Sequence, residues 1–146
     1  MAANTSPIFG RAADVQGYQS SNLAVSLPDG TGANVVSIAQ VDTVEGGFVD
    51  EIRLKPLGSP AATVVRVYVN TTTGAYTAGV SNTATTTFCI AEISLAAVTS
   101  STTAAQNDIS IPIRKALPAG YRILIGFGTL TGAATGYAFT VFGSKY

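Results

Sequence analysis

The clearest pattern along the chain is the alternation of apolar and polar positions in short runs. In the run Thr63–Asn70, valine occupies every second position from Val65 to Val69. Successive side chains of a strand leave opposite faces, and β-branched residues fit a pleated surface, so this run predicts a β-strand. Both faces are largely apolar, with Arg66 as the single charge. We therefore expect an inner strand of a sandwich or a strand against another subunit, and not a free edge.

Seven further runs have the length and composition of strands, and no stretch has a convincing helical period. They cover residues 18–26, 35–41, 48–55, 88–95, 108–113, 121–127 and 137–142. In the run at 48–55, Phe48, Ile52 and Leu54 share one face and charged residues share the other. About eight strands between turn signals predict an all-β chain, folded as a single antiparallel β-sandwich and jelly-roll-like in strand number. An immunoglobulin-like sandwich fits less well, because the chain has no tryptophan and a single cysteine.

The N-terminal stretch differs from the rest of the chain. Residues 1–15 have neither helical nor strand periodicity and predict an extended arm with an apolar anchor at Ile8 and Phe9. Residues 16–146 then form the β-sandwich domain. The pattern leaves open whether the arm packs on its own domain or docks on a partner.

Several stretches between the strands predict loops and turns. Residues 71–87 and 96–107 are rich in Thr and Ala and predict long surface loops, the first with room for a short strand around Tyr76. Residues 114–120 predict a turn that contains Pro and Gly. Residues 126–132, GFGTLTG, lack the glycine spacing of a dinucleotide loop and precede no helix, so they predict a hairpin.

The composition limits the partners. Hydrophobic residues make up 47% of the chain and charged residues 11%, and the net charge is zero. Nucleic acids and anionic membranes both require a basic surface, so we expect neither as a partner. A surface this poor in charge is a solubility risk for a lone monomer. Either Thr, Ser and Asn cover the surface, or much of it is covered in an oligomer or a larger assembly.

The titratable residues do not suggest catalysis. The chain has no histidine, which removes the commonest general base and the usual nucleophilic dyads and metal triads. Asp50 and Glu51 are adjacent on a strand and point to opposite faces, so they cannot form a two-carboxylate pair. Glu92 stands alone in an apolar strand, and we expect it to pair with Arg53 or Arg66. We therefore expect no catalytic residue, no cofactor, no metal site and no enzymatic activity.

Two further features concern the cellular setting. Cys89 lies in the apolar run FCIAEISL and is predicted to be a small buried hydrophobe; as the only cysteine it cannot form an intrachain disulfide. The N-terminus lacks the basic start and apolar segment of a secretory signal, and no run has the length of a transmembrane helix. We expect synthesis and assembly in a cytoplasm.

Four segments carry a resemblance to a known family. They are residues 4–9, 52–70, 116–129 and 139–146, which read NTSPIF, IRLKPLGSPAATVVRVYVN, ALPAGYRILIGFGT and FTVFGSKY. Taken together and in this order, they resemble a family of small tailed-bacteriophage proteins that decorate, or cement, the capsid surface. No single segment is specific, and the loops at 71–87 and 96–107 carry none of the resemblance.

The resemblance implies a virion structural protein that binds the outside of the major capsid protein shell and stabilises it. It also implies a β-sandwich that forms homotrimers at junctions between capsomers, made in the host cytoplasm and located on the capsid surface. Affinity would come from apolar and backbone contacts and from the avidity of many copies. Deleting residues 2–15 should then abolish capsid binding and leave the sandwich folded. The residues predicted to contact the shell or a neighbouring subunit are Pro7, Ile8, Phe9, Arg11, Arg66 and Tyr68.

Two other classes of protein fit the sequence. The alternative is a receptor- or carbohydrate-binding module of a phage tail or fibre, because jelly rolls also bind sugars. Tyr18, Tyr76 and Tyr137 are the aromatic residues that could stack on a sugar ring, and the chain has no tryptophan for this role. A nonviral fibre or shell subunit is the third class, and it would assemble with itself alone.

Overall fold

The computed structural model describes residues 10–21, 25–106, 108–129 and 135–146, and these form eight strands and no helix. No helix capable of crossing a membrane occurs in these ranges. The strands are β1 (Ala12–Ser21), β2 (Val36–Gln40), β3 (Gly47–Leu57), β4 (Thr63–Asn70), β5 (Thr87–Leu95), β6 (Ile109–Leu117), β7 (Arg122–Phe127) and β8 (Gly136–Lys145).

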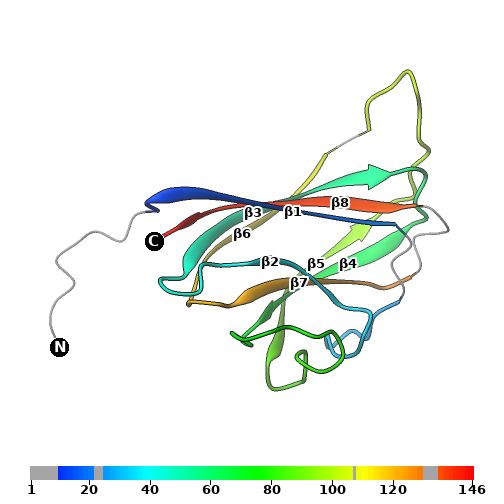
Figure 1. Ribbon diagram of the computed structural model, residues 1–146. Helices are drawn as coiled ribbons and strands as arrows, with labels where there is room; N and C mark the ends of the chain where they lie inside the picture. Colours follow the sequence, from blue (N-terminus) through cyan, green and yellow to red (C-terminus); the bar gives the residue numbers. More distant parts are fainter. Residues whose placement is uncertain (1–9, 22–24, 107, 130–134) are drawn as a thin grey trace, which may run out of the picture.

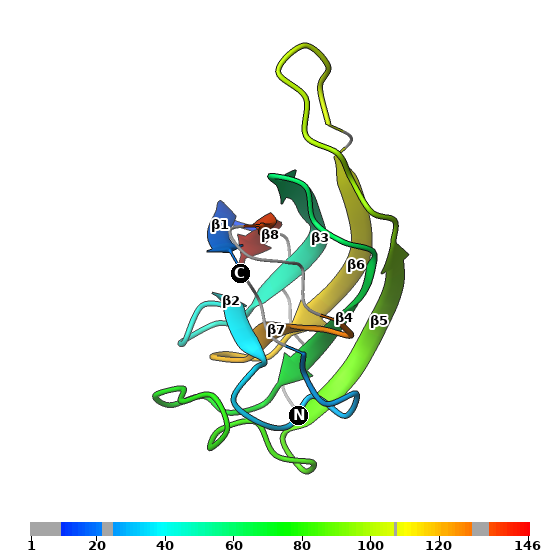
Figure 2. The ribbon, with the colours of Figure 1, turned by 90° about the vertical axis from the view of Figure 1, so that its right-hand side faces the viewer.

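The strands form two four-stranded sheets, which face each other as two layers (Figures 1 and 2). The strand order is β1-β8-β3-β6 in one sheet and β2-β7-β4-β5 in the other, and every pairing between these strands is antiparallel. The chain changes sheet at each connection except β4–β5, which gives the strand order of a jelly roll. The predicted all-β antiparallel sandwich is confirmed, and β4 is an inner strand as its two apolar faces indicated.

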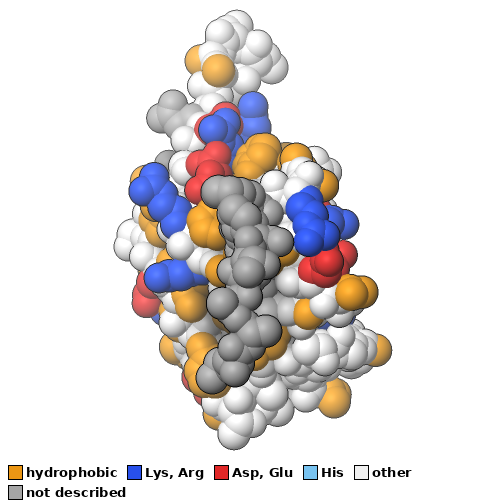
Figure 3. Space-filling model, turned by 90° about the vertical axis from the view of Figure 1, so that its left-hand side faces the viewer, with side chains coloured by type: hydrophobic (Ala, Val, Ile, Leu, Met, Phe, Trp, Pro, Cys, Tyr) orange, Lys and Arg blue, Asp and Glu red, His pale blue; other side chains and the backbone are white. Residues whose placement is uncertain are grey.

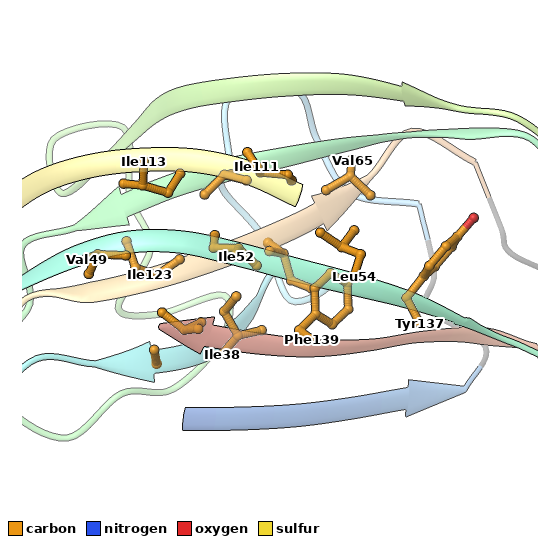
Figure 4. Packing of buried hydrophobic residues seen from close by; sticks show 14 of the residues in the cluster. Ile38, Val49, Ile52, Leu54, Val65, Ile111, Ile113, Ile123, Tyr137 and Phe139 are labelled. Carbon is orange, nitrogen blue, oxygen red and sulfur yellow. The ribbon is translucent and has the colours of Figure 1, made fainter. Parts of the chain in front are cut away.

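The core lies between the sheets and is built from alternate residues of the inner strands, joined by residues of the outer strands β2, β5 and β6 (Figure 4). Ile52 and Leu54 of β3 are fully buried, and they face residues of β4 and β7 such as Val65 and Ile125. An aromatic group completes one end, where the Phe127 ring stacks on that of Tyr137 at 5.8 Å between centroids. Apolar area removed from water along this seam stabilises the sandwich.

Bulges change which residues face the core. The sequence placed Phe48 on the buried face of its strand, but the β3 register shifts between Val49 and Glu51 against both neighbouring strands. Against β8 the extra residue is Asp50, which is exposed, whereas against β6 the extra residue lies in β6. Val49 takes the buried position, and Phe48 is only partly buried. A bulge shifts the alternation by one position, so the parity read from the sequence held for Ile52 but was wrong for Phe48.

Three predicted boundaries differ from the structure. β1 begins at Ala12, so residues 12–15 belong to the sandwich and not to an arm. β6 continues to Leu117 through residues predicted as a turn. The stretch at 126–132 does not join paired strands, because β7 and β8 lie in different sheets; the hairpin prediction was wrong. Pairing partners far away in the sequence decide these ends, and local turn signals do not record them.

One side of the sandwich is closed by a side chain. The Gln16 amide of β1 donates to the Gln40 carbonyl of β2 at 2.7 Å and accepts from the Gln40 N–H at 2.9 Å. It therefore occupies the backbone N–H and C=O of Gln40, at the end of β2, as a residue of a neighbouring strand would. On the opposite side, β5 and β6 are the outer strands of their sheets and do not pair with each other.

The two long loops have different roles. Residues 71–86 form no strand, including around Tyr76, and fold back with residues 25–35 over the outer face of the β2-β7-β4-β5 sheet. There Val35, Tyr68 and Leu124 make a second buried cluster. The β5–β6 loop, in contrast, projects from the sandwich (Figures 1 and 2). Its base is tied to the β3–β4 turn, where the Val98 N–H donates to the Pro60 carbonyl at 3.0 Å.

Candidate interaction surfaces

The predicted N-terminal contact residues are placed only in part. Pro7, Ile8 and Phe9 lie outside the residues that the structure describes. Arg11 is exposed, its N–H donates to the Lys145 carbonyl at 2.7 Å, and its guanidinium lies 3.4 Å from the Glu45 carboxylate. An exposed pair of this kind is weak, so the Arg11 side chain is free to exchange Glu45 for a partner group.

Arg66 lies on the outer face of β4 and is mostly covered. Its side chain is 16% exposed, and its guanidinium lies 3.3 Å from the carboxylate of Glu92, which is 53% exposed. The two residues are directly opposite each other on β4 and β5. The predicted pairing of Glu92 is therefore confirmed, with Arg66 as its partner. A cross-strand pair of this kind stabilises the sheet modestly. Because the Arg66 guanidinium is paired with Glu92, it is less available for the predicted contact with a subunit or the shell.

Tyr68 does not present its side chain to solvent. It is fully buried, and its hydroxyl donates to the carbonyls of Leu27 at 3.3 Å and Pro28 at 3.1 Å. Burial raises the pKa of Tyr68 to about 12, so the phenol remains a donor at neutral pH. Gly30, with φ +79°, lies so close to the ring that a Cβ atom there would stand 2.7 Å from it. Tyr68 anchors a loop of its own chain, and we do not retain it as a partner contact.

The second buried tyrosine provides a matched comparison. Tyr137 is also fully buried, but its hydroxyl has no hydrogen-bond partner within the described part of the chain. We expect Tyr137→Phe to raise the free energy of unfolding by about 1 kcal/mol and Tyr68→Phe to lower it by about 1–2 kcal/mol. Urea titration of the two variants measures both. A loss of stability in Tyr137→Phe would show that its hydroxyl has a partner, such as a buried water.

None of the tyrosines considered for sugar stacking offers an open ring. Tyr137 belongs to the core, and Tyr18 is partly buried against it. The Tyr76 hydroxyl donates to the Val35 carbonyl at 3.1 Å, and the Arg122 guanidinium lies 5.7 Å from the centre of its ring. Stacking on a sugar requires an uncovered aromatic face, so this arrangement gives no support to a carbohydrate site at these residues.

The carboxylate on the outer face of β3 is fully engaged. Glu51 accepts a hydrogen bond from Ser110 at 2.6 Å and one from Arg53 at 2.8 Å. These bonds, that from Ser110 first, lower the pKa of Glu51. The Arg53 guanidinium also lies over the Phe142 ring, 5.4 Å from its centre. A carboxylate held in its charged form in this way is a poor general acid.

Charges on the surface form small groups of both signs. Figure 3 shows them scattered among uncharged side chains on one face of the molecule. The described residues contain no group of three or more His, Cys, Asp and Glu that could hold a metal ion. A hollow of about 420 Å³ lies over β4 and β5, lined in part by Val64, Arg66, Ser94 and Gly128, with no carboxylate in its lining. The described residues therefore offer surfaces for contact with other molecules more clearly than they offer a site for chemistry.

Two exposed apolar residues of β5 were missed by the sequence analysis. On β5, Phe88 is 50% exposed and Ile90 is 40% exposed. Cys89, between them, is exposed, so the prediction that it is buried was wrong. The reason is that β5 is an outer strand with a register shift opposite Val67 and Tyr68, where Ile90 has no partner. The three consecutive apolar residues Phe88, Cys89 and Ile90 break the alternation expected of a strand with one solvent-facing side. This break could have indicated an irregular strand with exposed apolar side chains.

Comparison with protein-family models, with curated proteins and with solved structures finds no match for this chain.

Proposed function

We propose that this protein is a non-enzymatic capsid decoration, or cement, protein that binds the outside of a major capsid protein shell and stabilises it. It would act as a homo-oligomer on the virion surface, and the resemblance to phage decoration proteins points to trimers. A jelly roll by itself does not specify this function, because the fold carries many functions.

The observation that carries the proposal is the nature of the exposed surface. In a chain with only 11% charged residues, large apolar side chains stand 40–82% exposed on loops and outer strands. Exposed apolar surface that is not gathered into a ligand pocket favours contact with other proteins. These side chains are Val15, Val25, Leu27, Val44, Val80, Phe88 and Ile90.

The position of the resembling segments is informative. Residues 52–70, 116–129 and 139–146 cover most of β3, β4, β7 and β8, which are the inner strands of the two sheets. Inner strands build the core, so this part of the resemblance supports a common fold. Contact residues would then lie on loops, outer strands and the N-terminal segment, which vary more readily.

The copy number in particles tests the proposal. Quantitative mass spectrometry of particles from the source would compare this chain with the major shell subunit. A count comparable to the shell subunit is expected for a surface lattice. A few copies per particle would move the protein to the tail, and its absence from particles would refute a virion role.

We predict that deleting residues 2–9 abolishes capsid binding and leaves the fold intact. The deletion must end before β1, because residues 12–15 pair with β8 and their loss would damage the sheet. Binding through Ile8 and Phe9 should change little with salt, since neither side chain is charged. Co-sedimentation with shells lacking this protein measures binding, and a thermal melt checks the fold.

A matched control keeps the length of the segment. Replacing residues 2–5, AANT, by Gly and Ser leaves Pro7, Ile8 and Phe9 in place and should retain binding. Unchanged co-sedimentation of the 2–9 deletion would show that the segment does not hold the shell.

A further inference from the structure

The four outer strands of the sandwich differ in how they are protected from pairing with another chain. β1 and β2 lie on the same side of the sandwich and are linked by Gln16, which binds the backbone N–H and C=O of Gln40. β6 contains Pro112, which has no N–H to donate, and Arg114 at φ 50°, followed by Lys115. Proline, charge and irregular backbone are the devices that normally prevent edge-to-edge pairing.

β5 has the least protection of the four. Its nine residues include no proline and a single charge, Glu92, which is tied to Arg66 on the inner strand β4. A bulge often protects an edge, but here the residue that it adds is Ile90, an exposed apolar side chain beside Phe88. Among the described residues no strand pairs with the outer edge of β5, which runs along the right-hand margin of the sandwich in Figure 2.

We propose that β5 pairs antiparallel with β5 of a second copy of this chain, about a two-fold axis at Cys89. The unpaired N–H and C=O groups of an edge fit an extended polypeptide strand. A two-fold axis requires a self-complementary sequence, and Phe88-Cys89-Ile90 is one, since Phe88 then faces Ile90 of the second copy.

The charges of β5 favour this register. With the axis at Cys89, the paired stretch is Thr87–Ala91 of each copy, and Glu92 falls beyond it, next to the turn that precedes β5 of the second copy. No carboxylates face each other. With the axis at Ala91, Glu92 would face Ile90 of the second copy, and with the axis at Glu92 the two carboxylates would meet. Like charges directly opposite destabilise a strand pair, as does an apolar side chain set against a charge.

The pairing does not depend on the capsid proposal, and it predicts an even number of copies, in contrast to the trimer that the resemblance implies. The first test is the mass of the full chain in solution, by light scattering after size exclusion at high micromolar concentration. We expect a dimer for the natural chain. We expect Ile90→Arg to weaken dimerisation at least about tenfold, because a charge would enter a two-fold apolar contact.

The matched control is Val44→Arg, which places the same charge at an 82% exposed residue on the β2–β3 turn and should leave the dimer unchanged. Thermal melts show whether each variant is folded, and Ile90 makes no pairing with β4 that the change would remove. A monomer, a trimer, or an oligomer that Ile90→Arg does not weaken would overturn the proposal.

A disulfide between the Cys89 residues of two copies tests the proposed register of the β5 pair. Residues directly opposite in an antiparallel pair have Cα atoms about 4.5–5.5 Å apart, within the range of a disulfide. Mild oxidation with copper(II) phenanthroline should join two chains through Cys89: two thiols lose their protons, two copper(II) ions each accept one electron, and the S–S bond forms. The covalent dimer should be lost in Cys89→Ser and reduced in Ile90→Arg. A dimer that does not cross-link would overturn the register.

Discussion

Replacement of Ile52 by alanine is expected to lower the free energy of unfolding by about 4 kcal/mol. Ile52 is completely buried on the inner strand β3, directly opposite Val141 of β8 and Ile111 of β6. Val141 and Ile111 belong to strands that are hydrogen-bonded to β3 in the same sheet, so they can move little to fill the space of the lost atoms. Deleting a buried aliphatic side chain costs its transfer free energy and the cavity that it leaves. Urea unfolding followed by circular dichroism measures the change.

The control is Ile109→Ala, which removes the same atoms from a partly exposed position at the start of the outer strand β6. It should cost about 1 kcal/mol, because less area returns to water and no closed cavity forms. Equal losses in the two variants would contradict a core centred on β3.

Asn82→Ala is expected to lower the free energy of unfolding by about 3 kcal/mol. Asn82 is 2% exposed, and its amide donates to the carbonyls of Gly30 at 2.9 Å and Gly32 at 2.7 Å. Its carbonyl accepts from the Gly79 N–H at 2.6 Å. One side chain therefore joins the loop at 25–35 to the loop at 71–86. Alanine would leave the buried Gly30 carbonyl without this partner and would remove two further, partly buried bonds, and a buried group without a partner is costly.

The effect should also be local. Once the two loops separate, the cluster of Tyr68, Val35 and Leu124 beneath them should admit water, and amide hydrogen exchange there should accelerate more than in β3. The control is Asn34→Ala, which removes an exposed amide with one bond, to the Val25 carbonyl at 2.8 Å, and should cost at most about 1 kcal/mol. Similar losses in both variants would show that Asn82 does not link the loops.

Much of the fold could be predicted from alternation alone. The runs containing Ile111 and Ile113, and Ile123 and Ile125, became β6 and β7 with these residues buried. Period-two patterns are reliable when one face of a strand is fully covered. They failed at Phe48, because the bulge at Asp50 depends on the register with β6 and β8, which no local pattern contains.

The candidate surfaces were less accessible to sequence analysis. The Arg66–Glu92 pair could be predicted from the isolation of one carboxylate in an apolar strand. The burial of Tyr68 could not, since it depends on a loop some forty residues earlier in the chain that supplies the acceptors for its hydroxyl. The exposure of Cys89 depends on β5 being an outer strand, and strand order is set by long-range pairing.

The sequence by itself determined the class of this protein: alternating runs and a lack of helical periods require strands, and strands with one apolar face require a second sheet to cover them. Only the tertiary structure decided which strands became edges, where the bulges fall and which aromatic rings the loops cover. These are properties of pairs of segments far apart in the chain, and composition at one segment does not fix its partner. The surfaces proposed for contact belong to this second group, because an edge is defined by the strand that it lacks.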